Sequence, residues 1–159
     1  MATATEKKKY EYKSIATNRK ARFEFEIIDT LEAGIALTGS EVKVLREGKI
    51  NIQDCHARIE NGEVILYHMH IPEYKQANYN NHEEYRPRKL LLHRVQIRKL
   101  ERQVQEKGMT LVPLSVYFNE RNRIKVQLAV ARGKKLYDKR EAIAKKDQKR
   151  TEQREYKVR

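Results

Sequence analysis

The sequence has one cysteine (Cys55), no tryptophan and three prolines in 159 residues. A single cysteine excludes an internal disulfide and fits a reducing compartment, so we expect a cytoplasmic protein. No apolar run approaches the roughly 20 residues that cross a bilayer. No apolar stretch follows the charged residues 1–13 either, so neither a membrane span nor a signal peptide is predicted.

Patterns for metal binding and catalysis are also scarce. His68 and His70 share one face of a predicted strand, but further ligands at a metal-site spacing are missing. Cys55 and His56 are neighbours on a strand and point to opposite faces, which does not suit a nucleophile and its base. Glycine-rich phosphate loops and nucleophile elbows are absent from the sequence. We therefore expect no metal, no cofactor and no enzymatic activity.

Positive charge is what the chain has in excess. Lysine and arginine number 35 against 22 acidic residues, which gives a net charge of +13. This balance favours a nucleic acid as partner, and an anionic membrane surface is the weaker alternative. Residues 131–159 contain 12 Lys or Arg and 5 Asp or Glu, and so carry +7 of the total.

Apolar periodicity divides the chain into a body and a tail. Beyond residue 130, only Leu136, Ile143 and Val158 remain as larger aliphatic residues. We expect a flexible basic N-terminus at 1–13, a body at 14–131 and a basic tail at 132–159. The tail is rich in helix formers but has no face that could join a core. It is predicted to be disordered in the free protein and helical when it lies along nucleic acid.

Strict alternation predicts several strands in the body. In the first strand, Phe23, Phe25 and Ile27 are expected to face inward, and residues 32–34 are expected to form a turn. The other strands are predicted at 35–37, 50–52, 57–59, 64–71, 109–118 and 124–130.

Turn and cap signals complete the predicted body. Thr38 and Glu41 have the spacing of a capping box at the start of a short helix. The pair at 61–62 predicts a two-residue hairpin turn, and Gly108 is expected to end a longer helix over 93–107. This series favours a mainly β fold with small helices, in which an antiparallel sheet closes into an oligonucleotide-binding-like barrel. A two-layer α+β sheet is the alternative.

Basic residues that could contact nucleic acid occur in the body as well. Asn18, Arg19, Lys20 and Arg22 could contact phosphate and sugar oxygens, but Asn18 could equally cap a turn in a solvated loop. The polar loop at 73–87 contains tyrosines, which could stack on unpaired bases or pack on the body.

The chain carries a series of short motifs at 15–22, 32–34, 37–43, 45–46, 48–49, 88–92 and 133–140. Their residues and their order resemble the bacterial SsrA-binding protein family, small protein B. The resemblance covers about residues 14–150. It implies binding to the tRNA-like domain of transfer-messenger RNA and delivery of this RNA to the A site of stalled ribosomes. This process is trans-translation, in which the nascent chain is tagged for proteolysis.

The resemblance implies roles for particular residues of the body. Asn18, Glu32, Leu91 and Lys125 fall at family positions associated with RNA binding. Phe23 stands where the family often has histidine, so its ring can stack but cannot hydrogen bond. We expect basic neighbours to join the RNA interface, namely Arg19, Lys20, Arg22, Lys43, Arg46 and Lys89.

By resemblance, the tail lies in the empty mRNA channel of the small ribosomal subunit. Tyr137 would then stack in the decoding centre, and its neighbours would hold ribosomal RNA. The tail residues expected to contact the ribosome are Lys134, Lys135, Tyr137, Asp138, Lys139 and Arg140.

Two other classes of function compete with this hypothesis. A general RNA-binding or ribosomal protein would use charge alone and would discriminate weakly among RNAs. A nuclease would need a metal or an acid–base pair, which the sequence does not supply. We expect a monomer, because no heptad pattern or broad exposed apolar stripe is evident.

Overall fold

The computed structural model describes residues 13–76, 81–134 and 136–158, without the side chains of residues 106, 107, 136–138 and 158. Strands predominate in the body, and a long helix follows it. The elements are β1 (Lys13–Thr17), α1 (Arg19–Glu24), β2 (Phe25–Ile35), α2 (Gly39–Arg46), β3 (His56–Glu60), β4 (Glu63–Tyr67), β5 (Arg88–Leu91), α3 (Arg94–Lys107), β6 (Thr110–Phe118), β7 (Ile124–Gly133) and α4 (Leu136–Val158).

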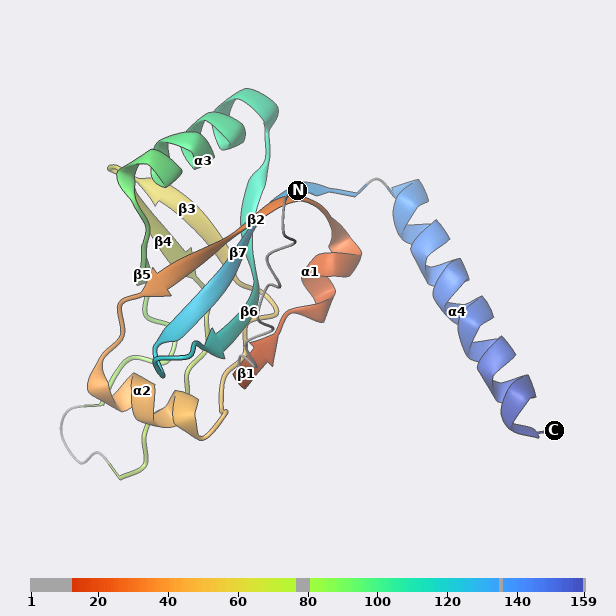
Figure 1. Cartoon of the computed structure of the whole chain (residues 1–159), viewed down its shortest axis with the longest axis horizontal. Coiled ribbons are helices and arrows are strands. Elements are labelled where there is room, and N and C mark those ends of the chain that lie inside the picture. Colours follow the sequence, from red (N-terminus) through yellow and green to blue (C-terminus); the bar gives the residue numbers. More distant parts are fainter. Residues whose placement is uncertain (1–12, 77–80, 135, 159) are drawn as a thin grey trace, which may run out of the picture.

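The strands form one antiparallel sheet that closes on itself. Neighbours follow the order β6–β3–β4–β5–β2–β7, and β7 pairs again with β6, so these strands complete a ring (Figure 1). β1 is not part of the ring. It pairs with residues 115–118 of β6, beyond Leu111, where β3 pairs with the same strand. The predicted mainly β, closed antiparallel fold with small helices is confirmed.

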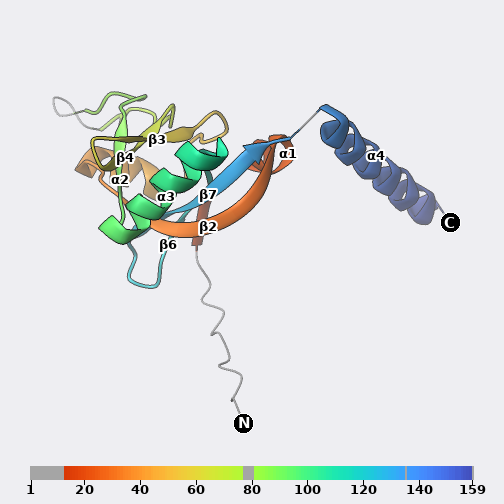
Figure 2. The same cartoon turned by 90° about the horizontal axis from the view of Figure 1, so that it is seen from above.

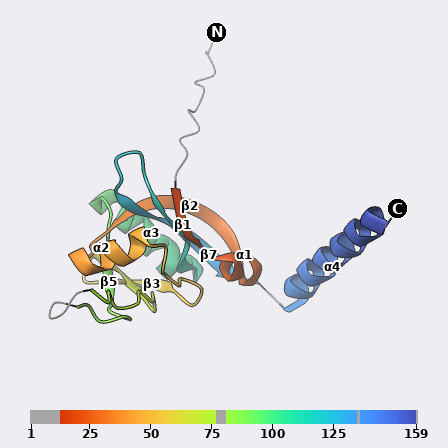
Figure 3. The ribbon, with the colours of Figure 1, turned by 90° about the horizontal axis from the view of Figure 1, so that it is seen from below.

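The helices lie at separate positions around the ring. α3 covers one end and α2 the opposite end, as the views from above and below show (Figures 2 and 3). α1 packs on the outside of β6 and β7. α4 extends away from the body, and it confirms that the tail residues favour a helix (Figure 1). Disorder of the tail in the free protein stays a prediction.

Alternation along β7 separates two apolar clusters. Val126, Leu128 and Val130 point into the ring and belong to its main core, together with Leu100 from α3. Ala129 and Ala131 point outward, where they form a smaller cluster beneath α1. Their small side chains let α1 approach the sheet closely, so one strand serves two cores.

Several local predictions are wrong, and the strands predicted at 35–37 and 64–71 end early, at Ile35 and Tyr67. Phe23 lies in α1 instead of a strand, and 36% of its surface is exposed. Residues 32–34 are not a turn, because they continue β2 and pair with the neighbouring strands. Residues 50–52 form only an isolated bridge, between Asn51 and His70. At Phe23 the cap of α1 by Asn18 overrides the local pattern, and at residues 32–34 the long-range pairing of β2 does so.

The local cap and turn signals are confirmed. Asn61 and Gly62 have φ of 51° and 74° in the β3–β4 turn, the left-handed values that a tight hairpin needs. Gly108 ends α3 with φ of 58°. The capping box of Thr38 and Glu41 begins α2, and the Thr38 N–H lies 3.0 Å from Glu41 Oε2.

Glu41 is also the centre of a charge cluster in which its own carboxylate and Arg88 are buried while Arg86 is partly exposed. Arg86 donates to both carboxylate oxygens, with Nε 3.1 Å from Oε1 and Nη2 3.0 Å from Oε2. Arg88 donates from Nε to Oε1 at 3.1 Å, and neither Glu41 nor Arg88 has an exposed side chain. Burial alone would raise the pKa of Glu41. The hydrogen bonds from Arg86 and Thr38 and the charge of Arg88 outweigh burial and hold this pKa below 4.5.

Arg88 joins the cluster to the chain between β4 and β5. Its Nη1 donates to the Met69 carbonyl at 2.7 Å, and its Nη2 donates to the Glu83 and Glu84 carbonyls. One guanidinium therefore connects β5 and α2 with Met69, which precedes the polar loop, and with the later part of that loop. Removing the carboxylate would leave a buried cation with backbone partners only.

Glu41→Gln is expected to destabilise the protein strongly. The variant leaves the buried Arg88 without its counter-charge, and breaking such a pair costs about 3 kcal/mol of unfolding free energy. Urea unfolding at neutral pH measures this loss. Glu47→Gln is the control, because Glu47 forms only an exposed pair with Lys49. A loss of less than 1 kcal/mol for Glu41→Gln would contradict the assigned role.

The same variant tests the pKa direction. The folded-state pKa of Glu41 is depressed, so its charge stabilises the fold above about pH 4.5 and this stabilisation is lost as pH falls through the folded pKa. The unfolding free energy of Glu41→Gln should therefore fall less between about pH 5 and about pH 3 than that of the unmodified protein. Parallel pH curves would show that Glu41 is not the group that titrates.

Candidate nucleic-acid interface

Predicted site residues from three strands come together on the outer face of the sheet. Gly34 on β2 pairs with Leu91 on β5 and with Lys125 on β7, which in turn pairs with Tyr117 on β6. Residues paired directly across a sheet point to the same face. Leu91, Lys125 and Tyr117 therefore form one row, and Glu32 joins it because it lies two residues from Gly34. We call these residues the outer row.

Gly34 leaves an opening in the outer row. A Cβ at this position would lie 3.2 Å from Leu91 Cβ, which is tighter than ordinary packing allows. Leu91 can lean over the glycine only because that side chain is missing. The Leu91 side chain remains 51% exposed, so an apolar surface lies one strand away from the cation of Lys125.

Glu32 is held by the sheet and does not point freely into solvent. The Tyr117 hydroxyl donates a hydrogen bond to Glu32 Oε2. Next to it, Ser115 Oγ donates to Gln127 Oε1 at 3.2 Å. Tyr117 thus fixes the direction of the carboxylate, and Oε1 has no hydrogen bond to any residue that the structure describes.

Two arginines that the sequence analysis missed extend this face. Arg121 and Arg123 lie in the β6–β7 turn, and they line a hollow of about 320 Å³ with Glu32 and Lys125. Asn119 Oδ1 accepts hydrogen bonds from the backbone N–H groups of Arg121 and Arg123, at 3.0 and 2.9 Å, and so fixes the turn. The available signal was a pair of cations in a short turn just before Lys125.

Asn18 differs from the other candidates because it is buried, with only 1% of its surface exposed. Its Oδ1 accepts the Ala21 N–H at 3.1 Å and so caps α1. Its Nδ2 donates to the carbonyls of Ile52 and Pro113, both at 3.1 Å. The amide is therefore fully used within the protein, and Asn18 fixes α1 to the sheet.

The α1 cations border the outer row. α1 covers the Ala129 and Ala131 end of β7, and Lys125 lies further along the same face of that strand. Arg19 and Arg22 are exposed. Lys20 Nζ bonds Asp54 Oδ1 at 3.0 Å, and this hydrogen bond raises the pKa of Lys20.

The α2 cations lie at another end of the ring. Lys43 Nζ lies 5.3 Å from the centre of the Tyr74 ring, while Arg46 is exposed. Lys89 is on the outer face of β5, where it pairs with Glu63 at 2.8 Å. The structure therefore places Lys89 near Leu91, and Lys43 and Arg46 apart from the outer row.

Tyrosines of the polar loop pack on the body where they are described. Tyr74 lies under Lys43, and the Tyr85 ring lies 4.8 Å from that of His70. Tyr79 lies outside the described residues. Tyr85 remains 56% exposed and keeps one face towards solvent.

The start of the tail is attached to α1. The Lys134 N–H donates to the Glu24 carbonyl at 3.0 Å, and Lys134 Nζ donates to the Arg22 carbonyl at 3.3 Å. Lys139 and Arg140 lie in the first turns of α4. Lys135, together with the side chains of Tyr137 and Asp138, lies outside the described part of the structure.

Other reactive side chains of the body do not form a site. Burial raises the pKa of the Cys55 thiol to about 12, which keeps it protonated and unreactive. Within the described ranges, no three His, Cys, Asp or Glu residues are grouped to hold a metal ion. Among the helices of these same ranges, none has the length and apolar character needed to span a membrane.

Comparisons with known proteins agree on one family. The model of the family described as "SmpB protein" matches residues 15–158. A protein of Desulforamulus reducens named SsrA-binding protein is 57% identical over 87% of this chain and 86% of its own. The protein of the same name from Bradyrhizobium diazoefficiens is 61% identical over 85% of this chain and 86% of its own.

A solved structure is similar as well. It is described as "tmRNA-SmpB: a journey to the center of the bacterial ribosome". The matching chain is 49% identical, with a TM-score of 0.65, and the match covers 80% of this chain and 93% of that one. At 49% identity the two chains are similar in sequence as well as in fold.

Asn18→Ala is expected to destabilise the protein by about 2 kcal/mol, because it removes a helix cap and leaves two carbonyls without their donor. Urea unfolding measures the change. Gln105→Ala on the exposed side of α3 is the control, with an expected change within about 0.5 kcal/mol. If the two variants were equally stable, Asn18 would have no structural role.

Proposed function

The chain belongs to the SmpB protein family, and we propose that it binds the tRNA-like domain of transfer-messenger RNA and delivers it to the A site of stalled ribosomes. Its relatives are named SsrA-binding protein, and the similar solved structure concerns tmRNA and SmpB in the bacterial ribosome. The outer row is the observation within this chain that carries the proposal. It presents an apolar side chain, a directed carboxylate and a cation on one rigid face.

The outer row suits RNA better than it suits duplex DNA. An unstacked base can lie on Leu91, since single-stranded loops expose their bases. The free oxygen of Glu32 can accept from a base amino group or a ribose 2′-hydroxyl. Lys125, with Arg121 and Arg123 beside it, supplies phosphate contacts that fix the register of the RNA.

α1 contributes a second set of contacts. Arg19 and Arg22 reach phosphates from the helix surface, and the exposed ring of Phe23 offers a stacking face on the same helix. Asn18 is a positioning residue here, because its amide holds α1 against the sheet. Lys20 contributes mainly charge, since it is already paired with Asp54.

The remaining body cations act at longer range. Lys43, Arg46 and Lys89 add to the positive field that attracts the RNA, and salt weakens their effect. The outer row sets the orientation of the bound RNA, which charge alone does not. A protein that used only charge would bind transfer-messenger RNA and ordinary tRNA alike at high salt, whereas we expect a preference for the tRNA-like domain to persist.

In this proposal the tail is the part of the protein that contacts the ribosome. α4 carries cations along its length and begins next to α1, so one protein can hold RNA with its body while its tail enters the empty mRNA channel. The proposed tail contacts in the decoding centre of the small subunit are Lys134, Lys135, Tyr137, Asp138, Lys139 and Arg140. We also propose that the protein works as a cytoplasmic monomer without a catalytic step.

Lys125→Ala is expected to weaken binding of the tRNA-like domain about tenfold and to reduce the salt dependence by about one phosphate contact. Leu91→Ala should weaken binding with an unchanged salt slope, because it removes an apolar contact. Filter binding across a salt series measures both. Lys49→Ala is the control, since Lys49 is exposed, lies off the outer row and pairs with Glu47. Equal effects of Lys49→Ala and Lys125→Ala would favour binding through charge alone.

Deletion of residues 135–159 should separate the two parts of the function. The cut retains β7 and the anchor of Lys134 on α1, so the body should stay folded. We expect affinity for the tRNA-like domain to change less than about threefold, since the contacts of the body remain. Tagging of nascent chains on stalled ribosomes should be lost. Comparable losses of both activities would contradict this division between body and tail.

A further inference from the structure

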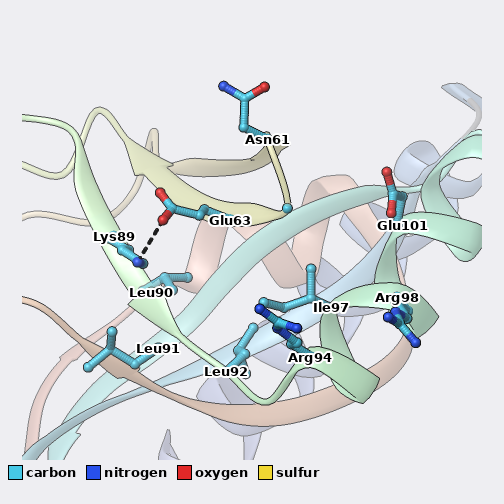
Figure 4. Close-up of a pocket in the computed structure, with 11 residues that line it drawn as sticks. Asn61, Glu63, Lys89, Leu90, Leu91, Leu92, Arg94, Ile97, Arg98 and Glu101 are labelled. Carbon is cyan, nitrogen blue, oxygen red and sulfur yellow. Dashed lines mark hydrogen bonds and ion pairs between the residues drawn. The ribbon is translucent and has the colours of Figure 1, made fainter.

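A hollow beside the outer row has no role in the function described so far. It measures about 600 Å³ and lies between the β3–β4 turn and α3 (Figure 4). Leu91, Leu92 and Ile97 form its apolar side, and Arg94 and Arg98 line it from α3. Its volume falls within the range of about 300–1,000 Å³ that is typical of small-molecule sites.

Three contacts hold parts of the rim of the hollow in place. The left-handed turn at Asn61 and Gly62 holds one rim. The ion pair of Lys89 with Glu63, at 2.8 Å, joins β5 to β4 (Figure 4). The N-terminus of α3 is capped, and the His93 N–H donates to Gln96 Oε1 at 3.0 Å. A fixed site loses little conformational freedom on binding.

Unused charges face this hollow. Arg94 and Arg98 are exposed, and neither side chain has a hydrogen bond or an ion pair with any residue that the structure describes. They are four residues apart, so they lie on the same side of α3. Glu101 also lines the hollow, and its carboxylate is likewise unpaired within the described ranges. Figure 4 shows it at the end of the hollow away from Lys89.

We propose that this hollow takes one unstacked nucleotide of the bound RNA. The base would lie on Leu91, Leu92 and Ile97. Its phosphate would be held by the guanidinium groups of Arg94 and Arg98, which suit the geometry of phosphate. Glu101 would accept a hydrogen bond from an amino group of the base. The inference rests on the proposed function and adds to it a subsite with a preference among bases.

Continuity with the outer row favours RNA as the occupant. Leu91 belongs both to the outer row and to the lining of the hollow, so an RNA strand crossing the sheet would reach the hollow next. An apolar wall with arginines beside it is the usual way to hold an unstacked base and its phosphate. The carboxylate of Glu101 favours bases with an exocyclic amino group over uracil, whose only donor on the base edge is the ring N3–H.

The first experiment uses the full chain and the tRNA-like domain. Arg94→Ala combined with Arg98→Ala should weaken binding about tenfold and lower the salt slope by one to two phosphate contacts. Lys99→Ala is the matched control on the same helix, because it lies outside the hollow and pairs with Asp29. It should change affinity less than twofold. Unfolding midpoints of all variants show whether the fold is intact.

The second experiment probes the hollow without the large RNA. Nucleoside 5′-monophosphates are titrated into the full chain while backbone amide signals are followed by NMR. GMP, AMP and CMP should bind with Kd of about 1 mM and shift amides near residues 61–63, 89–92 and 94–101. UMP should bind more weakly. Glu101→Gln should reduce this difference, because an amide both donates and accepts.

The outcomes separate this inference from the proposed function. Normal RNA binding by the arginine variants, or mononucleotide shifts spread over the surface, would overturn the subsite and leave the proposed function intact. Failure of the unmodified protein to prefer the tRNA-like domain would overturn the proposed function. In that case, localised mononucleotide shifts that depend on Glu101 would still support a nucleotide site in the hollow.

Discussion

The body depends on one buried carboxylate and the cations around it. Removing Glu41 and Arg88 from water costs several kcal/mol for each charge, and only complete hydrogen bonding offsets such a cost. Glu41 accepts from two arginines and from the backbone of its own helix, while Arg88 also donates to three carbonyls. The cluster therefore accepts one arrangement of α2, β5 and the polar loop, and it gives the fold specificity more than strength.

This inner constraint also sets the outer face. Arg88 and Leu90 point inward on β5, so Lys89 and Leu91 must point outward. The same alternation on β7 places Lys125 on the outer face and Ala131 beneath α1. A single register thus fixes the core, the packing of α1 and the row of candidate RNA contacts. An error of one residue in that register would exchange the inner and outer side chains.

The body and the tail use charge differently. On the body, cations are combined with Leu91, Glu32 and shaped hollows, to which the proposed function assigns the orientation and selection of the RNA. Along α4 the cations repeat without a comparable apolar face, so this helix suits a partner that surrounds it, such as a channel lined by RNA. The anchor of Lys134 on α1 places the start of the tail beside the proposed RNA contacts of that helix.

The sequence by itself determined the features that depend on neighbours within about four residues. The capping box, the Asn61 turn, the end of α3 and the helical preference of the tail are local, and so is the excess of positive charge. The tertiary structure alone decided which distant residues meet. It buried Asn18 as a cap, gave Glu41 its arginines, aligned Leu91 with Lys125 across Gly34 and formed the hollow beside α3. These contacts depend on strand register and closure of the ring, which no local pattern specifies.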